Sequence, residues 1–306
     1  MTTKIDFIGD IHGYYHNLVE LLLKMGYYKH KNVYVHNDRI PLFLGDLVDR
    51  GPQIRETVEL VRNMVEQGHA YIVMGNHEYN AVGFNWVKND GTFVRDHADN
   101  KVVQHKETLN QFATYWSEWE DHLNWFKKIP LFIENEHFRA IHACWNKDEI
   151  SYFKQHCPNH LINDDFWLKS SKKYTREYEA IDVLLKGLEI PLPDGLTFTD
   201  KQGYVRRRIR VNWWKKIEQP TLKNICVPPE NHLPEIPMID FYQNFEHYPE
   251  NEKPIFFGHY WKNGIPKLET HNVCCLDFSI AKGGYLAAYR WNGEKILHEN
   301  SFVYVK

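Results

Sequence analysis

The 306-residue chain lacks the features that mark several large protein classes. It has no run of 18 apolar residues, so we expect neither a membrane-spanning helix nor a membrane partner. The segment from Met1 to Asp10 has no apolar stretch of the kind that a signal peptide needs, so the sequence predicts a cytoplasmic location. No repeat or low-complexity segment stands out. These absences leave a globular protein, and the length allows one large α/β domain or two smaller ones.

Cysteine is too scarce and too poorly spaced for a disulfide framework. The five cysteines make an odd number, and no two of them form a C-x-x-C pair. We therefore expect reduced thiols. Cys274 and Cys275 lie inside an apolar run, which predicts buried strand residues.

An excess of positive charge is also missing. The 37 Lys and Arg residues face 40 Asp and Glu residues, which gives a formal net charge of −3. This balance argues against a long footprint on duplex nucleic acid, but it leaves a nucleotide or a nucleic-acid end as a substrate. Aromatic residues, by contrast, are abundant, with 10 Trp, 18 Tyr and 17 Phe. Core packing is the first explanation, and base stacking in a substrate groove is the alternative.

The first 80 residues alternate between strand-like and helix-like patterns. β-prone runs occur at 4–8 and 70–74 and as two short strands within 33–44, and apolar residues at helical spacing separate them at 18–25 and 54–65. A polar motif stands where each β-prone run ends. Because the carboxyl ends of parallel strands meet at one edge of a sheet, we expect the three motifs to converge there.

The rest of the chain is less regular, and we expect a single domain over 1–306 with insertions at about 83–130 and 150–235. One helix in the first insertion is predicted to bury Trp116, Trp119, Leu123 and Phe126. Three histidines there have no ligand-like spacing and are interpreted as solvated or helix-capping: His97, His105 and His122. The second insertion is expected to form a cap of helices and loops.

Further strands are predicted at 138–141, 254–257, 273–278 and 285–290. Asn292-Gly293 is a typical hairpin turn, which predicts a last strand at 295–297. The first two of these strands end at His142 and His259, so two more polar turns join the three described above.

The segment from Gly45 to Pro52 has the most informative chemistry. It reads Gly-Asp-Leu-Val-Asp-Arg-Gly-Pro between a strand and a helix. Carboxylates in such a place suit hard or borderline cations, and the adjacent guanidinium suits a phosphate.

Six candidate metal ligands follow the predicted strands: Asp10, His12, Asp46, Asn76, His142 and His259. The first two can reach one cation, Asp46 is placed to bridge two, and the last three can complete the second site. This mixed set suits Mn, Fe, Zn or Ni better than calcium, and we favour manganese. Two such ions about 3.5–4 Å apart would hold a bridging hydroxide for in-line attack on a phosphoryl group.

Three further side chains suit the same reaction. His77 could act as general acid on the leaving oxygen, and Asp49 could orient His77 and keep it protonated. Arg50 could bind the phosphate oxygens through its planar fork.

Three blocks of sequence resemble the signature blocks of the calcineurin-like metallophosphoesterases, in particular the bacterial type of the phosphoprotein-phosphatase branch: Gly9-Asp10-Ile11-His12-Gly13, Gly45-Asp46-Leu47-Val48-Asp49-Arg50-Gly51 and Gly75-Asn76-His77-Glu78. The resemblance implies a four-layer α/β/β/α sandwich with a binuclear metal centre. It implies that Asp10, His12 and Asp46 bind the first metal ion. It assigns Asp46, Asn76, His142 and His259 to the second, with His259 open to either site.

The resemblance also implies a second phosphate-binding arginine from the cap. Among Arg206, Arg207, Arg208 and Arg210 we choose Arg210, for which a solvated basic face is the alternative. The chain departs from the family pattern where Ala143-Cys144 follows His142 and where Tyr260-Trp261 follows His259. We expect these bulky neighbours to reshape the pocket.

We therefore expect a binuclear metal-dependent hydrolase of phosphate monoesters, acting on a phosphopeptide, a nucleotide or a nucleic-acid end. The alternative is hydrolysis of dinucleoside polyphosphates or nucleotide phosphoanhydrides, which the aromatic-rich insertion suggests. Asp49 and Glu78 count against this alternative, because the resemblance implies Gly and Asp at those positions in the bacterial dinucleoside tetraphosphate hydrolases. A non-catalytic binding scaffold is the third hypothesis.

Overall fold

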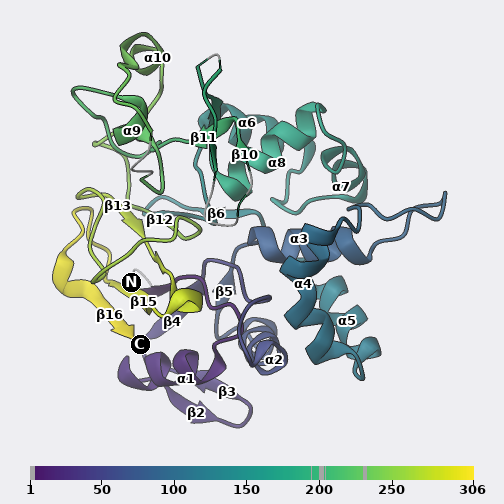
Figure 1. Ribbon diagram of the computed structural model, residues 1–306. Coiled ribbons are helices and arrows are strands. Elements are labelled where there is room, and N and C mark those ends of the chain that lie inside the picture. The colour runs from purple at the N-terminus through teal and green to yellow at the C-terminus, as the bar shows by residue number, and fades with distance from the viewer. Residues whose placement is uncertain (1–3, 194, 200–202, 204, 230–232) are drawn as a thin grey trace.

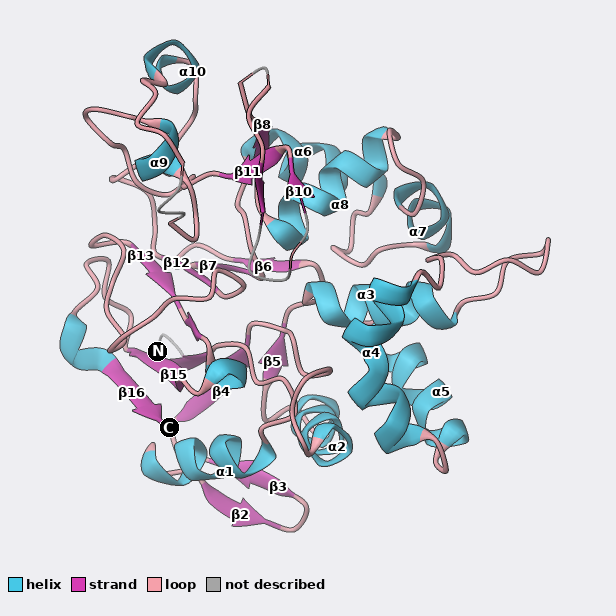
Figure 2. Cartoon of the chain, viewed as in Figure 1, coloured by secondary structure: helices cyan, strands magenta, loops and turns pink. Residues whose placement is uncertain are grey.

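The computed structural model describes residues 4–193, 195–199, 203, 205–229 and 233–306 (Figure 1). Two β-sheets lie at the centre of the molecule, and helices lie outside both of them (Figure 2). The predicted α/β class and the α/β/β/α layering are confirmed. None of the helices in the described part of the chain has the length and apolarity needed to cross a bilayer.

The first sheet has six strands in the order β14-β15-β1-β4-β5, and β16 pairs with β15. Its strands are β1 (Lys4–Ile8), β4 (Arg39–Phe43), β5 (Tyr71–Ile72), β14 (Asp277–Phe278), β15 (Tyr285–Trp291) and β16 (Phe302–Val305). β1 pairs in parallel with β4, and β4 pairs in parallel with β5. The parallel arrangement expected for the first 80 residues is therefore confirmed, and the carboxyl ends of these strands share one edge.

The second sheet has four strands in the order β13-β12-β7-β6. They are β6 (Phe132–Glu134), β7 (Arg139–Ile141), β12 (Ile255–Phe257) and β13 (Val273–Cys275). β12 pairs in parallel with β7 and with β13. Since β7 ends before His142 and β12 ends before His259, this sheet brings two histidines to its own carboxyl edge.

Side chains that alternate along the strands fill two different spaces. Phe7, Leu42 and Phe256 belong to a core cluster between the two sheets. Phe7 stacks on Phe256 with ring centroids 3.6 Å apart and an interplanar angle of 8°. Their chain neighbours belong to the cluster that includes the helices: Ile8, Phe43 and Phe257. Burial of each such side chain contributes roughly 1.5–3 kcal/mol, so both faces of both sheets are held by apolar packing.

The outer layers follow from amphipathic helices. α1 (Tyr15–Lys24) and α2 (Ile54–Glu66) lie along the first sheet, next to the small hairpin of β2 (Tyr28–His30) and β3 (Val33–Val35) (Figure 1). α1 buries Leu18, Leu21 and Leu22, which recur at the spacing of one helix face. On the second sheet lie α6 (Lys147–His156) and α8 (Arg176–Lys186), with α7 (Asp164–Ser170) beside them.

The remaining elements lie in or next to the two predicted insertions. α3 (Asn76–Asn85) begins before the first insertion, which contains α4 (Asp99–Phe112) and α5 (Trp116–Phe126). After α8 come β8 (Glu189–Pro191), β9 (Phe198–Thr199), β10 (Val205–Arg206), β11 (Arg208–Arg210), α9 (Leu222–Ile225) and α10 (Ile239–Gln243). β8 pairs with β11, and β9 pairs with β10. This part therefore contains short hairpins as well as the expected helices and loops.

Two sequence-based expectations were wrong. Asn292-Gly293 does not begin a tight hairpin, because Glu294 accepts the backbone N–H of Asn292 at 2.7 Å and the hydroxyl of Tyr289 at 3.0 Å. The chain returns as a strand only at β16, after a longer loop. In α5, Trp116 is 47% exposed, whereas the other three predicted core residues of that helix are buried. Trp116 stands at the first position of the helix, where little of the core reaches it.

Candidate active site

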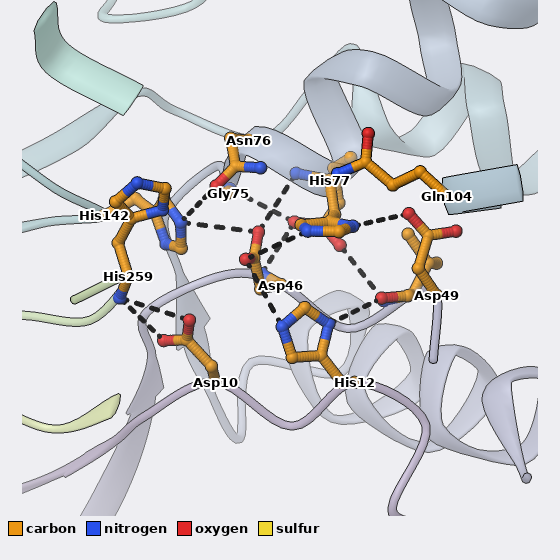
Figure 3. A network of polar contacts seen from close by, with 12 residues as sticks. Asp10, His12, Asp46, Asp49, Gly75, Asn76, His77, Gln104, His142 and His259 are labelled. Carbon is orange, nitrogen blue, oxygen red and sulfur yellow. Dashed lines mark hydrogen bonds and ion pairs between the residues drawn. The ribbon is translucent and has the colours of Figure 1, made fainter. Parts of the chain in front are cut away.

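Five turns, each at the carboxyl end of a strand, converge on one site (Figure 3). The structure brings together all six predicted metal ligands around Asp46, which follows β4. Backbone hydrogen bonds join the turns directly. The carbonyl of Asp46 accepts the N–H groups of Ile11 and His12 at 3.1 and 2.8 Å, and the carbonyl of His142 accepts the N–H of Gly258 at 2.9 Å. The motifs are therefore held to one another by the main chain before any side chain is considered.

Unusual backbone conformations mark the site. Five of its non-glycine residues have positive φ values: His12 (48°), Asp46 (53°), Asp49 (66°), Arg50 (74°) and His259 (71°). Each such residue costs on the order of 1–3 kcal/mol unless its surroundings impose the conformation, and such residues cluster at functional sites. The strand ends also approach closely, since a Cβ on Gly75 would lie 2.3 Å from the amide nitrogen of Asp46. Only glycine fits there.

Three imidazoles surround the carboxylate of Asp46 without reaching normal hydrogen-bond distance. The Nε2 atoms of His12 and His77 lie 3.6 and 3.8 Å from its Oδ2, and the Nε2 of His142 lies 3.4 Å from its Oδ1. Ligand atoms bound about 2.1 Å from one cation would have about this separation. Among the described residues, two groups of side chains have ligand atoms close enough to hold an ion: His12, Asp46 and His77, and Asp46, His142 and His259.

Hydrogen bonds from Nδ1 orient two of the histidines. His12 donates from Nδ1 to the carbonyl of Val48 at 2.9 Å, and His142 donates from Nδ1 to the carbonyl of Leu44 at 2.7 Å. The Nε2 of each ring therefore faces the site, which is the arrangement that metal-ligating histidines use.

Burial would lower the pKa of His142, but the charge of Asp46 raises it to about 10, and a bound cation would displace the proton that Nε2 shares with the Oδ1 of Asn76 at 3.0 Å. The Nε2 of His259 is buried and has no hydrogen-bond partner among the described residues. A divalent cation would satisfy it, so these residues fit a metal centre.

Burial and nearby charges set the protonation of the site. Burial and the neighbouring His77 lower the pKa of His12 to about 3, and burial with the charge of Arg210 lowers the pKa of His259 well below its usual value. Both rings are thus neutral, as a ligand must be. Burial and the nearby Asp277 raise the pKa of Asp10 well above its usual value. A cation in this crowded group would favour the ionised carboxylate.

Glu78 organises the central turn, a role that the sequence analysis missed. Its carboxylate is fully buried and accepts the backbone N–H groups of Asp46 at 2.8 Å, Leu47 at 2.7 Å and Gly75 at 3.1 Å. One side chain at the start of α3 therefore ties together the turns after β4 and β5. The sequence did indicate that the turns after β4 and β5 lie side by side at one sheet edge, and that proximity could have predicted this role of Glu78.

Asp49 has an unexpected set of partners. Its carboxylate contacts the Nδ1 of His77 at 2.5 Å, as expected for the pair, and also the Nδ1 of His105 at 2.7 Å. The prediction that His105 and His122 are solvated or helix-capping was wrong, because both stand inside helices and their exposed fractions are 3% and 4%. Burial would raise the pKa of Asp49, but the charge of His77 and the two imidazole hydrogen bonds hold it well below its usual value.

The third of these histidines, His97, is exposed, as predicted. Its Nε2 lies 2.7 Å from the carbonyl oxygen of Phe84, and its ring stacks between Phe84 and Phe93. It lies away from the six predicted ligands in the contacts that the structure describes, so it packs the loop that follows α3.

The two predicted phosphate-binding arginines lie over the bulky residues that follow His259. The guanidinium carbon of Arg50 is 5.2 Å from the ring centroid of Trp261, and that of Arg210 is 5.7 Å from the ring centroid of Tyr260. The Nε atoms of both arginines are buried without a hydrogen-bond partner in the described part of the chain. Buried donors of this kind are available to an anion, although Arg210 also lies 3.8 Å from Glu189.

A small hollow opens beside the site. Its lining includes His12, Arg50, Trp261, Ser279 and Lys282. Asp277 holds one wall, because its carboxylate accepts the backbone N–H groups of Trp261 at 2.8 Å and Ser279 at 3.0 Å. The residues that follow β12 and β14 therefore shape the approach to the site.

Comparisons with known proteins agree with this geometry. A family model described as calcineurin-like phosphoesterase matches residues 3–192. An asymmetrical bis(5'-nucleosyl)-tetraphosphatase from Geobacillus sp. (strain WCH70) is 52% identical over 75 residues, which are 24% of this chain and 31% of that protein. A symmetrical bis(5'-nucleosyl)-tetraphosphatase from Vibrio parahaemolyticus is 25% identical over 304 residues, which are 96% of this chain and 97% of that protein.

A solved structure shows the same fold. A protein serine/threonine phosphatase from Saccharomyces cerevisiae aligns with 99% of this chain and 79% of its own, with a TM-score of 0.51 and 14% sequence identity. The family model covers more than half of the 306 residues, including the turns after β1, β4, β5 and β7. The chain belongs to the calcineurin-like phosphoesterase family.

Proposed function

We propose that the protein hydrolyses phosphate monoesters at a centre of two divalent transition-metal ions. The proposed ligands are Asp10, His12, Asp46, Asn76, His142 and His259, with Asp46 shared between the two ions. When bound, such ions supply Lewis-acid charge to the phosphoryl group and lower the pKa of water. The neutral His12 and His259 and the shared position of Asp46 support this assignment. Manganese remains our first choice, with Fe, Zn or Ni as alternatives.

The proposed roles of the remaining side chains follow from their positions. Arg50 and Arg210 bind the non-bridging phosphate oxygens, because both carry buried donors that lack a partner among the described residues. His77 directs Nδ1 to Asp49 and Nε2 toward Asp46, so Nε2 is the atom that donates a proton to the leaving oxygen. Asp49 stays ionised and orients the imidazole for this step.

The pairing of His77 with Asp49 is the observation that carries the choice of a monoester. The alkoxide released from an alkyl monoester is a strong base and leaves only when it is protonated. The nucleotide released from a phosphoanhydride is a much weaker base, so its departure depends less on an acid. A buried acid whose Nδ1 lies 2.5 Å from a carboxylate is therefore best explained by a poor leaving group.

A second candidate function is hydrolysis of dinucleoside polyphosphates. The specific observation in its favour is that the two relatives described above are both named bis(5'-nucleosyl)-tetraphosphatases, one of them over nearly the whole chain. The cationic side chains of Arg50, Arg210 and Lys282 near the site would also suit a substrate with several phosphates.

A substrate panel tests the two candidates. The full chain is stripped of metal with a chelator, reloaded with Mn, Ni or Zn, and assayed on a phosphoserine peptide, a nucleotide 3′-phosphate and diadenosine tetraphosphate. We expect kcat/KM to be at least about tenfold higher on a monoester than on the polyphosphate, and His77→Ala to lose about 10²–10⁴-fold on monoesters. A preference for the polyphosphate, with little effect of His77→Ala, would replace the first candidate by the second.

A further inference from the structure

Asp49 is held by more donors than a two-residue acid pair requires. Its Oδ2 contacts the Nδ1 of His77 at 2.5 Å. Its Oδ1 accepts from the Nδ1 of His105 at 2.7 Å and from the hydroxyl of Thr108 at 2.6 Å. The same hydroxyl oxygen accepts the backbone N–H of Asp49 at 3.0 Å. Both carboxylate oxygens are therefore engaged, and the plane of the carboxylate is fixed from two sides.

His105 and Thr108 reach Asp49 from a separate element. They stand three residues apart on α4, so they lie on the same face of that helix. The backbone of Asp49 has a positive φ of 66°, and the bond from its N–H to Thr108 helps to hold that conformation. α4 thus controls both the main chain and the side chain of Asp49.

The surroundings of His105 fix the direction of its ring. The ring lies against the rings of Phe84 and Trp119, with centroids 5.2 and 5.8 Å away, and it is 3% exposed. Because a carboxylate only accepts hydrogen bonds, Nδ1 carries the proton that reaches Asp49. Nε2 is buried and has no hydrogen-bond partner among the residues that the structure describes, so the contact with Asp49 is the one polar contact that orients the ring there.

The contacts from α4 leave one carboxylate oxygen of Asp49 to His77. His105 and Thr108 both donate to Oδ1, whereas His77 contacts Oδ2. The two residues of α4 therefore orient the carboxylate without taking the place of His77.

We propose that His105 and Thr108 are positioning residues for the protonation of the leaving group. They hold Asp49 so that the Nε2 proton of His77 points at the leaving oxygen, to which it is transferred as the ester bond to phosphorus breaks. Neither residue touches the substrate. This inference rests on the proposed function, since it concerns how the general acid of that reaction is aimed. A misplacement of about 1 Å in such a group can cost on the order of 10²-fold in rate.

The experiment compares two phosphate monoesters with different leaving groups, using the metal-loaded full chain. Phosphoserine releases an alkoxide that needs a proton, whereas p-nitrophenyl phosphate releases a phenolate that needs it less. For His105→Ala we expect kcat on phosphoserine to fall by about 10–100-fold, with kcat on p-nitrophenyl phosphate within about threefold of the parent and KM little changed. Thr108→Val, which keeps the shape of the side chain, should show the same pattern with a smaller loss.

A conservative variant and a matched control separate positioning from stability. His105→Asn retains an N–H donor close to the place of Nδ1 and should restore part of the lost rate on phosphoserine. His122→Ala removes a histidine of α5 that is equally buried and lies 3.5 Å from Glu118. It should lower thermal stability about as much as His105→Ala does, but it should change kcat on the two esters by the same factor.

Three results would count against this inference, and each has a different meaning. Equal losses on both esters for His105→Ala and Thr108→Val would show that α4 is only structural and would overturn the inference alone. If His77→Ala also loses equally on both esters, the acid step is wrong and the inference falls with it. If the parent hydrolyses neither ester but cleaves the polyphosphate, the first proposed function fails, and the inference fails as well.

Discussion

Strand β1 has a buried carboxylate, Asp6, at its centre, and a second, Asp10, follows its carboxyl end; the two have opposite surroundings. Asp6 accepts from the Nε of Arg39 at 2.8 Å, from the hydroxyl of Tyr27 at 2.9 Å and from the Nε of Arg290 at 3.3 Å. Arg39 in turn donates to the backbone carbonyls of Ile5 and Trp291. The charge of Asp6 is therefore compensated inside the protein, by two guanidinium groups.

Asp10, just beyond the carboxyl end of β1, lies among groups that repel or fail to satisfy its carboxylate. It accepts the backbone N–H of His259 at 3.1 Å, and the nearest charges that raise its pKa are those of Asp277 and Asp46. The difference shows how to tell a structural polar cluster from a ligand site. The buried carboxylate of a structural cluster has its hydrogen-bond donors and counter-charges within the protein, whereas that of a ligand site obtains them only when a cation or other ligand binds.

The largest expected effect is the loss of activity when the metal is removed or when Asp10 loses its charge. Chelation, or Asp10→Asn, should lower kcat/KM by at least about 10³-fold, because the phosphoryl charge loses its electrostatic stabilisation. The metal-free variant should be as stable to urea as the metal-free parent, or more stable, since the substitution removes a crowded buried charge. If the metal-free Asp10→Asn variant were strongly destabilised, Asp10 would be a structural residue like Asp6, and the contrast between the two would be wrong.

For Asp6 we expect the reverse, a loss of stability with little loss of activity. Asp6→Asn leaves the guanidinium of Arg39 buried without its counter-charge, so the free energy of unfolding should fall by about 3 kcal/mol. The folded fraction should keep kcat within about twofold of the parent. Urea denaturation and steady-state kinetics at low temperature check both parts, and a 100-fold loss of kcat in fully folded protein would contradict the division.

Glu78 sharpens the comparison, because it is a satisfied carboxylate placed at the active site. In Glu78→Gln the amide nitrogen would face backbone donors, since Oε2 accepts from both Asp46 and Gly75 and Oε1 accepts from Leu47. We expect the free energy of unfolding to fall by about 2 kcal/mol and kcat to fall by about tenfold. Differential scanning calorimetry and the phosphoserine assay measure the two effects. A loss of activity without a loss of stability would assign Glu78 to the ligand group instead.

The smallest effect concerns Glu134, at the edge of the second sheet. Burial would raise its pKa, but its hydrogen bonds from Lys154 and Arg139 lower the pKa to about 2. A lowered carboxyl pKa stabilises the fold above pH 4.5 and loses that contribution as the pH falls toward 2. The stability difference between the parent and Glu134→Gln should therefore be about 1 kcal/mol or less at pH 6 and should shrink at pH 3. Urea titrations at the two pH values measure this stability difference. A difference that is larger at pH 3 than at pH 6 would contradict the lowered pKa of Glu134.

The sequence predicted the convergence of the ligands because consecutive parallel strands force their carboxyl ends to one edge. Asp10, His12, Asp46 and Asn76 follow from that rule alone. The positions of His142 and His259 needed the second sheet, which the sequence implied only through the family resemblance. Their roles remain proposals, but their meeting point was foreseeable.

The misses share a physical cause. The contact of His105 with Asp49 joins a helix face to a turn 56 residues earlier in the chain, and neither partner carries a local signal for the other. The prediction of a hairpin turn at Asn292-Gly293 was wrong for the opposite reason. The local sequence strongly favours such a turn, but the side chain of Glu294 accepts the backbone N–H of Asn292 instead. Local patterns fix strands and helices well, but they do not say which side chain will fill the space between them.

The stacked rings of Phe7 and Phe256 couple the two halves of the sandwich to its chemistry. The proposed ligands Asp10 and Asp46 belong to one sheet, and His142 and His259 belong to the other. An ion held by both sets acts as a cross-link, so its affinity and the spacing of the sheets are thermodynamically linked. A core residue such as Phe256, which is not a candidate ligand, therefore contributes to the metal affinity through the spacing of the two sheets.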